Sequence, residues 1–128
     1  MTSRYFDVNV FVYYLTGDTK NGSKAMAWLF NTDERYTSSV TPFLVTVVLG
    51  KVLGRSLRNY ELLKTVLDAL NSMGVKYLDL PPWEKIAEVM LKYKLDVEDS
   101  IHVATAAENG LEMVSNDEEL KSKVNAVF

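Results

Sequence analysis

Segments of β-strand character alternate with helical segments along the whole chain, and this alternation constrains the fold more than any other feature. Runs of β-branched, aromatic and other apolar residues predict strands over residues 5–8, 35–38, 75–80 and 111–115, and a final strand near Ala126. Apolar residues at helical spacing predict helices over residues 10–15, 23–31, 42–53 and 59–73, followed by helices that begin near Pro82, Asp96 and Glu118. Strands that alternate with helices form βαβ units, so we expect an α/β fold of three layers, with a mainly parallel central sheet and helices on both faces.

Glycine and proline mark several of the expected helix ends. Gly17 and Gly74 follow helical segments and are expected to end them. Thr41 and Pro42 predict the N-cap and the first residue of the helix that follows, because proline there loses no hydrogen bond and its ring presets the helical φ. On this assignment Leu44 is the third residue of its helix.

The length and composition indicate a single domain that spans residues 1–128. Of the 128 residues 48% are hydrophobic and 24% are charged, and no internal repeat or flexible linker divides the chain. The absence of cysteine excludes a disulfide framework and thiolate chemistry. A net charge of -3 argues against nonspecific coating of nucleic acid. Because no apolar run approaches the roughly 20 residues that span a bilayer, and no signal segment is present, we expect a cytoplasmic protein with no membrane association.

Three aspartates are expected to meet at one edge of the predicted sheet. Asp7 lies at the end of the first strand, Asp117 follows the strand over residues 111–115, and Asp99 lies in the first turn of a helix. In open parallel sheets ligands bind at the carboxyl ends of the strands, which is where these side chains are expected. Each acid also has a structural explanation as a helix N-cap or as part of a capping pair with Asp96. Capping alone does not explain why all three are expected at the same edge.

Carboxylates gathered at one point favour a metal ion. Two of them at 4 Å repel by about 1 kcal/mol in water and by severalfold more near a protein surface. A hard divalent cation removes this repulsion, and ligands that are all oxygen suit Mg²⁺ or Mn²⁺. We therefore predict a Mg²⁺ or Mn²⁺ site at this edge.

Three short motifs relate the chain to a known family. Asp7-Val8-Asn9, Asp99-Ser100-Ile101-His102-Val103-Ala104 and Ser115-Asn116-Asp117 occur in this order, and the aspartates of the last two are 18 positions apart. Together they resemble the motifs of PIN domains, and particularly of the small VapC-like toxin ribonucleases of toxin-antitoxin modules. The resemblance extends over nearly the whole chain and implies a PIN-like fold.

The resemblance also implies an activity and a set of site residues. It implies Mg²⁺- or Mn²⁺-dependent endonucleolytic hydrolysis of single-stranded RNA, with Asp7, Asp99 and Asp117 as metal ligands. Asn9 and Ser115 would position these ligands or the attacking water. The implied partners are the RNA, a small antitoxin protein and a second copy of the chain in a homodimer.

Leu44 departs from the family's pattern. The family usually carries a Glu three residues after a Thr or Ser, and the matching segment here, from Thr37 to Leu44, ends in leucine. No Asp or Glu occurs between Arg35 and Tyr60, so no neighbouring acid can replace it. We therefore expect weakened metal binding and reduced or lost cleavage.

Two other functions remain open from the sequence. A noncatalytic PIN-fold module that binds RNA or protein is favoured by Leu44. A phosphotransfer enzyme of the haloacid dehalogenase type would use Asp7 as a covalent nucleophile, but that class requires a second Asp where this chain has Asn9. The only histidine, His102, is expected to have a packing role, although a neutral imidazole can also bind a metal.

Overall fold

Four parallel strands form the central sheet of the structure, a computed structural model that describes all residues from 1 to 128. The strands are β1 (Ser3–Phe6), β2 (Glu34–Ser38), β3 (Lys76–Leu78) and β4 (Glu112–Val114). Their order is β3-β2-β1-β4, and every neighbouring pair is parallel, so β1 lies inside the sheet between β2 and β4. The expected final strand is reduced to an isolated bridge between Val114 and Val127.

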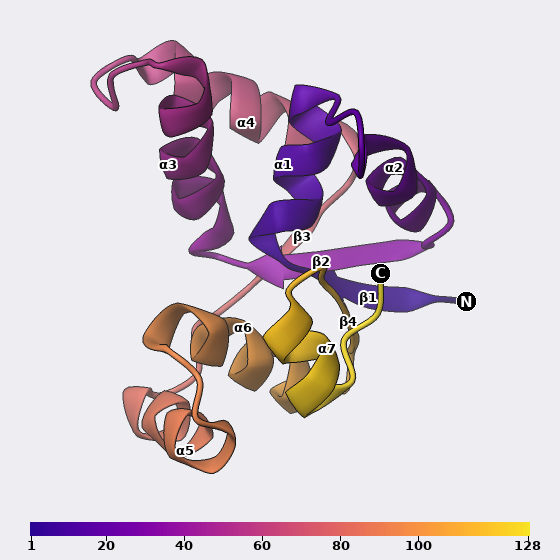
Figure 1. The fold of residues 1–128 in the computed structure, drawn as a ribbon, viewed down its shortest axis with the longest axis vertical. Coiled ribbons are helices and arrows are strands. Elements are labelled where there is room, and N and C mark those ends of the chain that lie inside the picture. Colours follow the sequence, from indigo (N-terminus) through magenta and orange to yellow (C-terminus); the bar gives the residue numbers. More distant parts are fainter.

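Helices cover both faces of this sheet, which confirms the three-layer α/β fold expected from the sequence. They are α1 (Val8–Thr16), α2 (Gly22–Phe30), α3 (Thr41–Leu53), α4 (Tyr60–Ser72), α5 (Trp83–Tyr93), α6 (Val97–Glu108) and α7 (Glu118–Val124). Figure 1 shows α1 to α4 on one side of the strands and α5 to α7 on the other. None of these helices combines the length and the apolar character that crossing a membrane requires.

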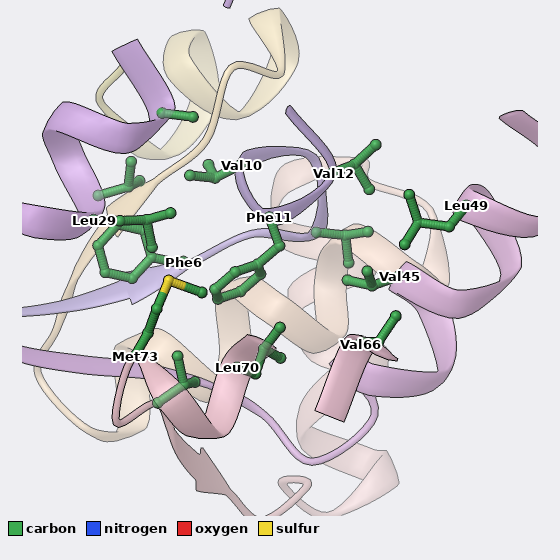
Figure 2. Close-up of a cluster of buried hydrophobic side chains, with 14 of the residues drawn as sticks. Phe6, Val10, Phe11, Val12, Leu29, Val45, Leu49, Val66, Leu70 and Met73 are labelled. Carbon is green, nitrogen blue, oxygen red and sulfur yellow. The ribbon is translucent and has the colours of Figure 1, made fainter. Parts of the chain in front are cut away.

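β1 is buried on both faces because successive side chains of a strand point in opposite directions. Phe6 packs into the larger hydrophobic cluster beneath α1 to α4, together with Phe11 and Leu70 (Figure 2). Tyr5 points the other way and packs with Met113 and other residues of the second cluster. Ser3 and Arg4 at the start of β1 are only partly buried, and the fully buried half of the strand leads directly into Asp7.

The start of α3 differs from the expectation. The helix begins at Thr41 with Val40 as its N-cap, so Leu44 is its fourth residue rather than its third. Thr41 does not cap the helix, because its hydroxyl oxygen accepts a hydrogen bond of 2.7 Å from the Thr37 hydroxyl of β2. A Glu at position 44 would therefore not occupy the position of a capping box.

The apolar face of α2 is narrower than the sequence indicated. Ala25 and Leu29 are fully buried, as expected, but Met26 and Phe30 are 48% and 51% exposed. Phe30 instead packs at the surface against the ring of Tyr14. Because α2 packs mainly against α1, only Ala25 and Leu29, which lie four positions apart on one face of the helix, enter the core.

The buried cluster between the sheet and α4 determines stability. We expect Leu70→Ala to lower the free energy of unfolding by about 2–5 kcal/mol, because Leu70 is fully buried and the truncation leaves a cavity. Leu91→Ala is the matched control, since Leu91 is 83% exposed, and it should change stability by less than about 0.5 kcal/mol. Urea unfolding followed by circular dichroism measures both, and similar losses for the two variants would contradict this account of the core.

Candidate metal centre

The carboxyl ends of two adjacent strands bring Asp7 and Asp117 to the same edge. β1 and β4 are paired with Phe6 opposite Val114. Asp7 directly follows β1, and its backbone N–H donates to the carbonyl oxygen of Val114 at 3.0 Å. Asp117 lies three residues beyond the end of β4 and begins α7. The parallel register therefore places both side chains at one end of the sheet.

A pocket of about 380 Å³ opens at this edge, and the three predicted aspartates all line it. Asn9 lines the pocket as well, whereas Ser115 is fully buried beside it. The remaining lining residues come from α1, α3 and the start of α6: Val8, Val12, Tyr13, Val48, Asp96 and Glu98. Residues separated by up to 110 positions in the chain, from Asp7 to Asp117, thus share one cavity.

Asp7 is the most tightly held of the three aspartates. It is only 6% exposed, and its Oδ2 accepts a hydrogen bond of 2.7 Å from the Ser115 hydroxyl. Its Oδ1 accepts from the backbone N–H of Val8 at 2.8 Å. The Ser115 oxygen in turn accepts from the backbone N–H of Asp117 at 3.1 Å and from the Asn9 amide at 3.5 Å. Ser115 therefore links Asp7 to the chain segment that carries Asp117.

The acids at this edge also cap helices. Asp7, Asp96 and Asp117 are the N-caps of α1, α6 and α7, and Asp96 accepts from the backbone N–H of Asp99 at 2.8 Å. A helix N-terminus is positive and stabilises an ionised carboxylate by about 0.3–1 kcal/mol. Capping and convergence, which the sequence left as competing explanations, occur together because three helices begin at one place.

Among the acids that line the pocket, Asp99 has a clearly raised pKa. Burial, together with the negative charges of Asp96, Asp7, Asp117 and Glu98 in that order of influence, raises the pKa of Asp99 to about 7. One carboxyl of the group therefore holds a proton near neutral pH when no cation is present. Such a shift at a cleft is typical of a functional site.

The donor set fits a hard divalent cation. Asp99, Asp117 and Glu119 each offer a carboxylate oxygen, and these oxygens lie within 4.8 Å of one another. Oxygen-only donors suit Mg²⁺, Mn²⁺ or Ca²⁺. Glu119 also pairs with Lys123 at 2.8 Å. Asp7 is not part of this trio, although it lines the same pocket.

Sequence analysis did not single out Glu119 or Glu98 as site residues. Both lie in the first turn of a helix, α7 and α6, where acidic residues are common simply because they stabilise the helix N-terminus. Their nearness in sequence to Asp99 and Asp117 is the signal that could have identified them. Asp96 was predicted only as a cap, and it caps α6 while also lining the pocket.

Position 44 contributes no acid to the pocket. Leu44 is partly buried and packs against the larger hydrophobic cluster. Val48, one turn further along α3, lines the pocket, so α3 presents apolar side chains to the site. The acids therefore come from the starts of α1, α6 and α7, opposite an apolar wall.

His102 and Tyr5 lie fully buried below the acids. The Tyr5 hydroxyl lies 2.5 Å from His102 Nδ1, and the other ring nitrogen, Nε2, lies 3.7 Å from Asp7 Oδ1. Burial raises the pKa of the Tyr5 hydroxyl, and the charge of Asp7 raises it further. The phenol therefore keeps its proton at neutral pH.

The fold and the carboxylate pocket define an α/β protein with an acidic site at the carboxyl end of a parallel sheet. The PIN domain family model matches residues 4–125 of the chain. The chain therefore belongs to the PIN domain family. No curated protein matches its sequence.

Three solved structures have a similar fold. The crystal structure of PAE2754 from Pyrobaculum aerophilum superposes with a TM-score of 0.72 at 19% identity, over 99% of this chain and 88% of that chain. A chain of a toxin-antitoxin complex from Klebsiella pneumoniae gives 0.69 at 23% identity, over 98% and 97%. A chain of VapBC2 from Rickettsia felis, bound to a DNA fragment from their promoter, gives 0.70 at 15% identity, over 98% and 96%. These likenesses show the fold.

The raised pKa of Asp99 predicts a pH-dependent stability. The unfolded chain ionises this carboxyl near its ordinary pKa of 3.8, whereas the folded chain does so only near 7, so Asp99 increasingly destabilises the fold as pH rises between these values. Above pH 7 the cost is constant. Asp99→Asn removes it, and we expect the variant to gain more thermal stability over the natural chain at pH 8 than at pH 4.

The comparison is made in EDTA, with melting temperatures of both chains at the two pH values. Asp68→Asn is the control, because Asp68 is exposed on α4 and pairs only with Lys64. An Asp99→Asn effect of equal size at pH 4 and pH 8 would show that Asp99 does not titrate as described.

Proposed function

We propose that this chain is a Mg²⁺- or Mn²⁺-dependent endoribonuclease of the VapC-like PIN type, which hydrolyses phosphodiester bonds in single-stranded RNA. The observation that carries the proposal is the single pocket lined by Asp7, Asp99 and Asp117 in a PIN fold. A divalent ion in this pocket would neutralise charge on the phosphate and lower the pKa of a water molecule. No side-chain nucleophile is required.

The residues of the pocket have distinct roles in this proposal. Asp99 and Asp117 would hold the ion, and Glu119 could add a further oxygen because its carboxylate lies beside theirs. Asp7, fixed by its hydrogen bonds, would complete the ligand set from the buried side. Ser115 orients Asp7, and Asn9 supports Ser115 and lines the pocket.

An exposed basic segment supports a nucleic-acid substrate. Lys51 lies in the last turn of α3, and Arg55 and Arg58 lie between α3 and α4; all three are exposed and form no ion pair with an acid. Lys51 lies three residues beyond Val48, and therefore about one helical turn from the wall of the acidic pocket. A phosphate backbone that is repelled by the acids around the site can be held by these cations.

The proposed protein partners are an antitoxin and a second copy of the chain. The proposal of an antitoxin partner is based on the similarity to chains from a toxin-antitoxin complex and from VapBC2. The homodimer rests on the family resemblance, and the location we propose is the cytoplasm. The family match gives no support to a phosphotransfer enzyme of the haloacid dehalogenase type.

We expect Asp7→Asn to abolish cleavage of a single-stranded RNA in the presence of Mn²⁺. The substitution removes one negative charge from the ligand set but leaves the size of the side chain nearly unchanged. Cleavage is followed on a fluorescently labelled single-stranded RNA, with EDTA as a blank and Asp68→Asn as the matched control. Full cleavage by Asp7→Asn would contradict the proposed chemistry.

Because Leu44 stands where the family usually has an acid, a noncatalytic PIN-fold binding module is the second candidate function. Substitution of Leu44 distinguishes this module from a ribonuclease. We expect Leu44→Glu to raise Mn²⁺ affinity and RNA cleavage by about tenfold or more, because position 44 lies one turn from Val48 on the same face of α3. Leu44→Gln has the same shape without the charge and should give neither gain. If Leu44→Glu and Leu44→Gln behave alike in calorimetry and cleavage, the position is not part of the site.

A further inference from the structure

The buried pair of Tyr5 and His102 is the polar feature that the proposed reaction leaves unused. His102 is fully buried on α6, and Tyr5 is fully buried on β1. In the whole structure only two buried side-chain polar atoms lack a hydrogen-bond partner, and His102 Nε2 is one of them. This nitrogen lies 3.7 Å from Asp7 Oδ1, and the side chains of both residues are buried.

The neighbours of the imidazole select one of its two neutral forms. A neutral histidine has one N–H donor and one acceptor nitrogen. If the Tyr5 hydroxyl donates to Nδ1, the imidazole proton is on Nε2 and points towards the Asp7 carboxylate. In the opposite form the lone pair of Nε2 would face a negatively charged oxygen. A phenol, with an ordinary pKa near 10, is a donor at neutral pH, so the first arrangement is favoured: the hydroxyl donates to Nδ1 and the Nε2–H faces the carboxylate.

We propose that Tyr5 fixes the Nε2–H form of His102, and that this N–H orients the Asp7 carboxylate for metal binding. His102 is then a positioning residue that acts through Asp7, and it is not itself a ligand. The inference rests on the proposed function, because it takes Asp7 to be a metal ligand.

The other contacts of Asp7 show why a third donor matters. The Val8 N–H binds Oδ1 and the Ser115 hydroxyl binds Oδ2, so each oxygen already has one donor. At 3.7 Å the imidazole N–H is beyond ordinary hydrogen-bond length, and its effect there is electrostatic attraction in a buried setting of low dielectric constant. Groups that orient metal-binding carboxylates in this way typically contribute 10–100-fold to metal affinity.

Packing alone predicts a different outcome. If His102 only fills space between α6 and the sheet, loss of the Tyr5 hydroxyl should leave metal binding unchanged, because phenylalanine has nearly the same shape. If the hydroxyl determines which nitrogen carries the proton, its loss should weaken metal binding without changing any residue that touches the ion.

The protonation form of His102 can be observed directly. Because the chain has one histidine, ¹⁵N NMR detects its two imidazole nitrogens without overlap from other histidines. In EDTA at pH 7.5 we expect the proton on Nε2 in the natural chain. A proton on Nδ1, or on both nitrogens, would overturn the inference.

Calorimetric titration with Mn²⁺ tests the effect on the site. We expect Tyr5→Phe to lower Mn²⁺ affinity by about tenfold or more. Tyr36→Phe is the matched control, because Tyr36 lies opposite Tyr5 on β2 but its hydroxyl donates to Glu34, away from the acidic pocket, and the variant should bind Mn²⁺ as the natural chain does. Equal affinities for Tyr5→Phe and Tyr36→Phe would overturn the positioning role and leave the proposed function standing.

Substitution of His102 adds a rescue measurement. His102→Gln keeps an N–H group within reach of Asp7 and should retain more Mn²⁺ affinity than His102→Leu, which has none. Circular dichroism measures whether each variant folds. If His102→Leu does not fold, the Mn²⁺ affinity of Tyr5→Phe by itself tests the positioning role. A natural chain that binds no Mn²⁺ would overturn the proposed metal site, and the positioning role with it.

Discussion

Repulsion among carboxylates at the carboxyl edge of the sheet is the constraint on which the rest of the site depends. Asp7, Asp99 and Asp117 share one pocket, and the burial and charge there raise the pKa of Asp99 to about 7. The fold offsets part of this repulsion by starting α1, α6 and α7 at the same edge, so that three positive helix ends point at the acids. The offset is incomplete, since Asp99 still holds its proton to neutral pH, and an oxygen-binding cation is the group that would complete it.

The alternation of strands and helices was enough to predict the three layers, because each helical segment between parallel strands must cross over a face of the sheet. The same rule predicted that Asp7 and Asp117 would lie close together, since both follow strands. Two local features were not predicted. The start of α3 was misplaced because the Thr41 hydroxyl is engaged by Thr37, four residues earlier in β2, and Glu119 was missed because an acid in the first turn of a helix is ordinary on its own. That Asp7, Asp99 and Asp117 bind a metal remains a prediction.

Leu44 contributes apolar packing and supplies no carboxylate. It packs against the larger hydrophobic cluster, and burying a leucine side chain contributes about 1.5–3 kcal/mol when the burial is complete. A glutamate at the same position would lose this contribution and add a negative charge one helical turn from Val48, which lines the acidic pocket. If position 44 is the place of the family's fourth acid, as we propose, the chain has gained buried apolar surface there and given up one ligand for the ion.

The pocket has a rigid side and an adaptable side, and this division follows from burial. Asp7 is held by the backbone of Val8, by Ser115 and by the charge distribution of His102, so its orientation is established when β1 and α6 pack together. Glu119 is exposed and paired with Lys123, and a surface pair of this kind contributes little, so its carboxylate can turn towards an ion at small cost. Asp99 lies between these extremes, half-buried and protonated near neutral pH. Under the proposed function, binding of a cation would displace the proton of Asp99 and draw in the adaptable Glu119 while Asp7 stays in place, so the groups behind Asp7 would influence affinity without touching the ion.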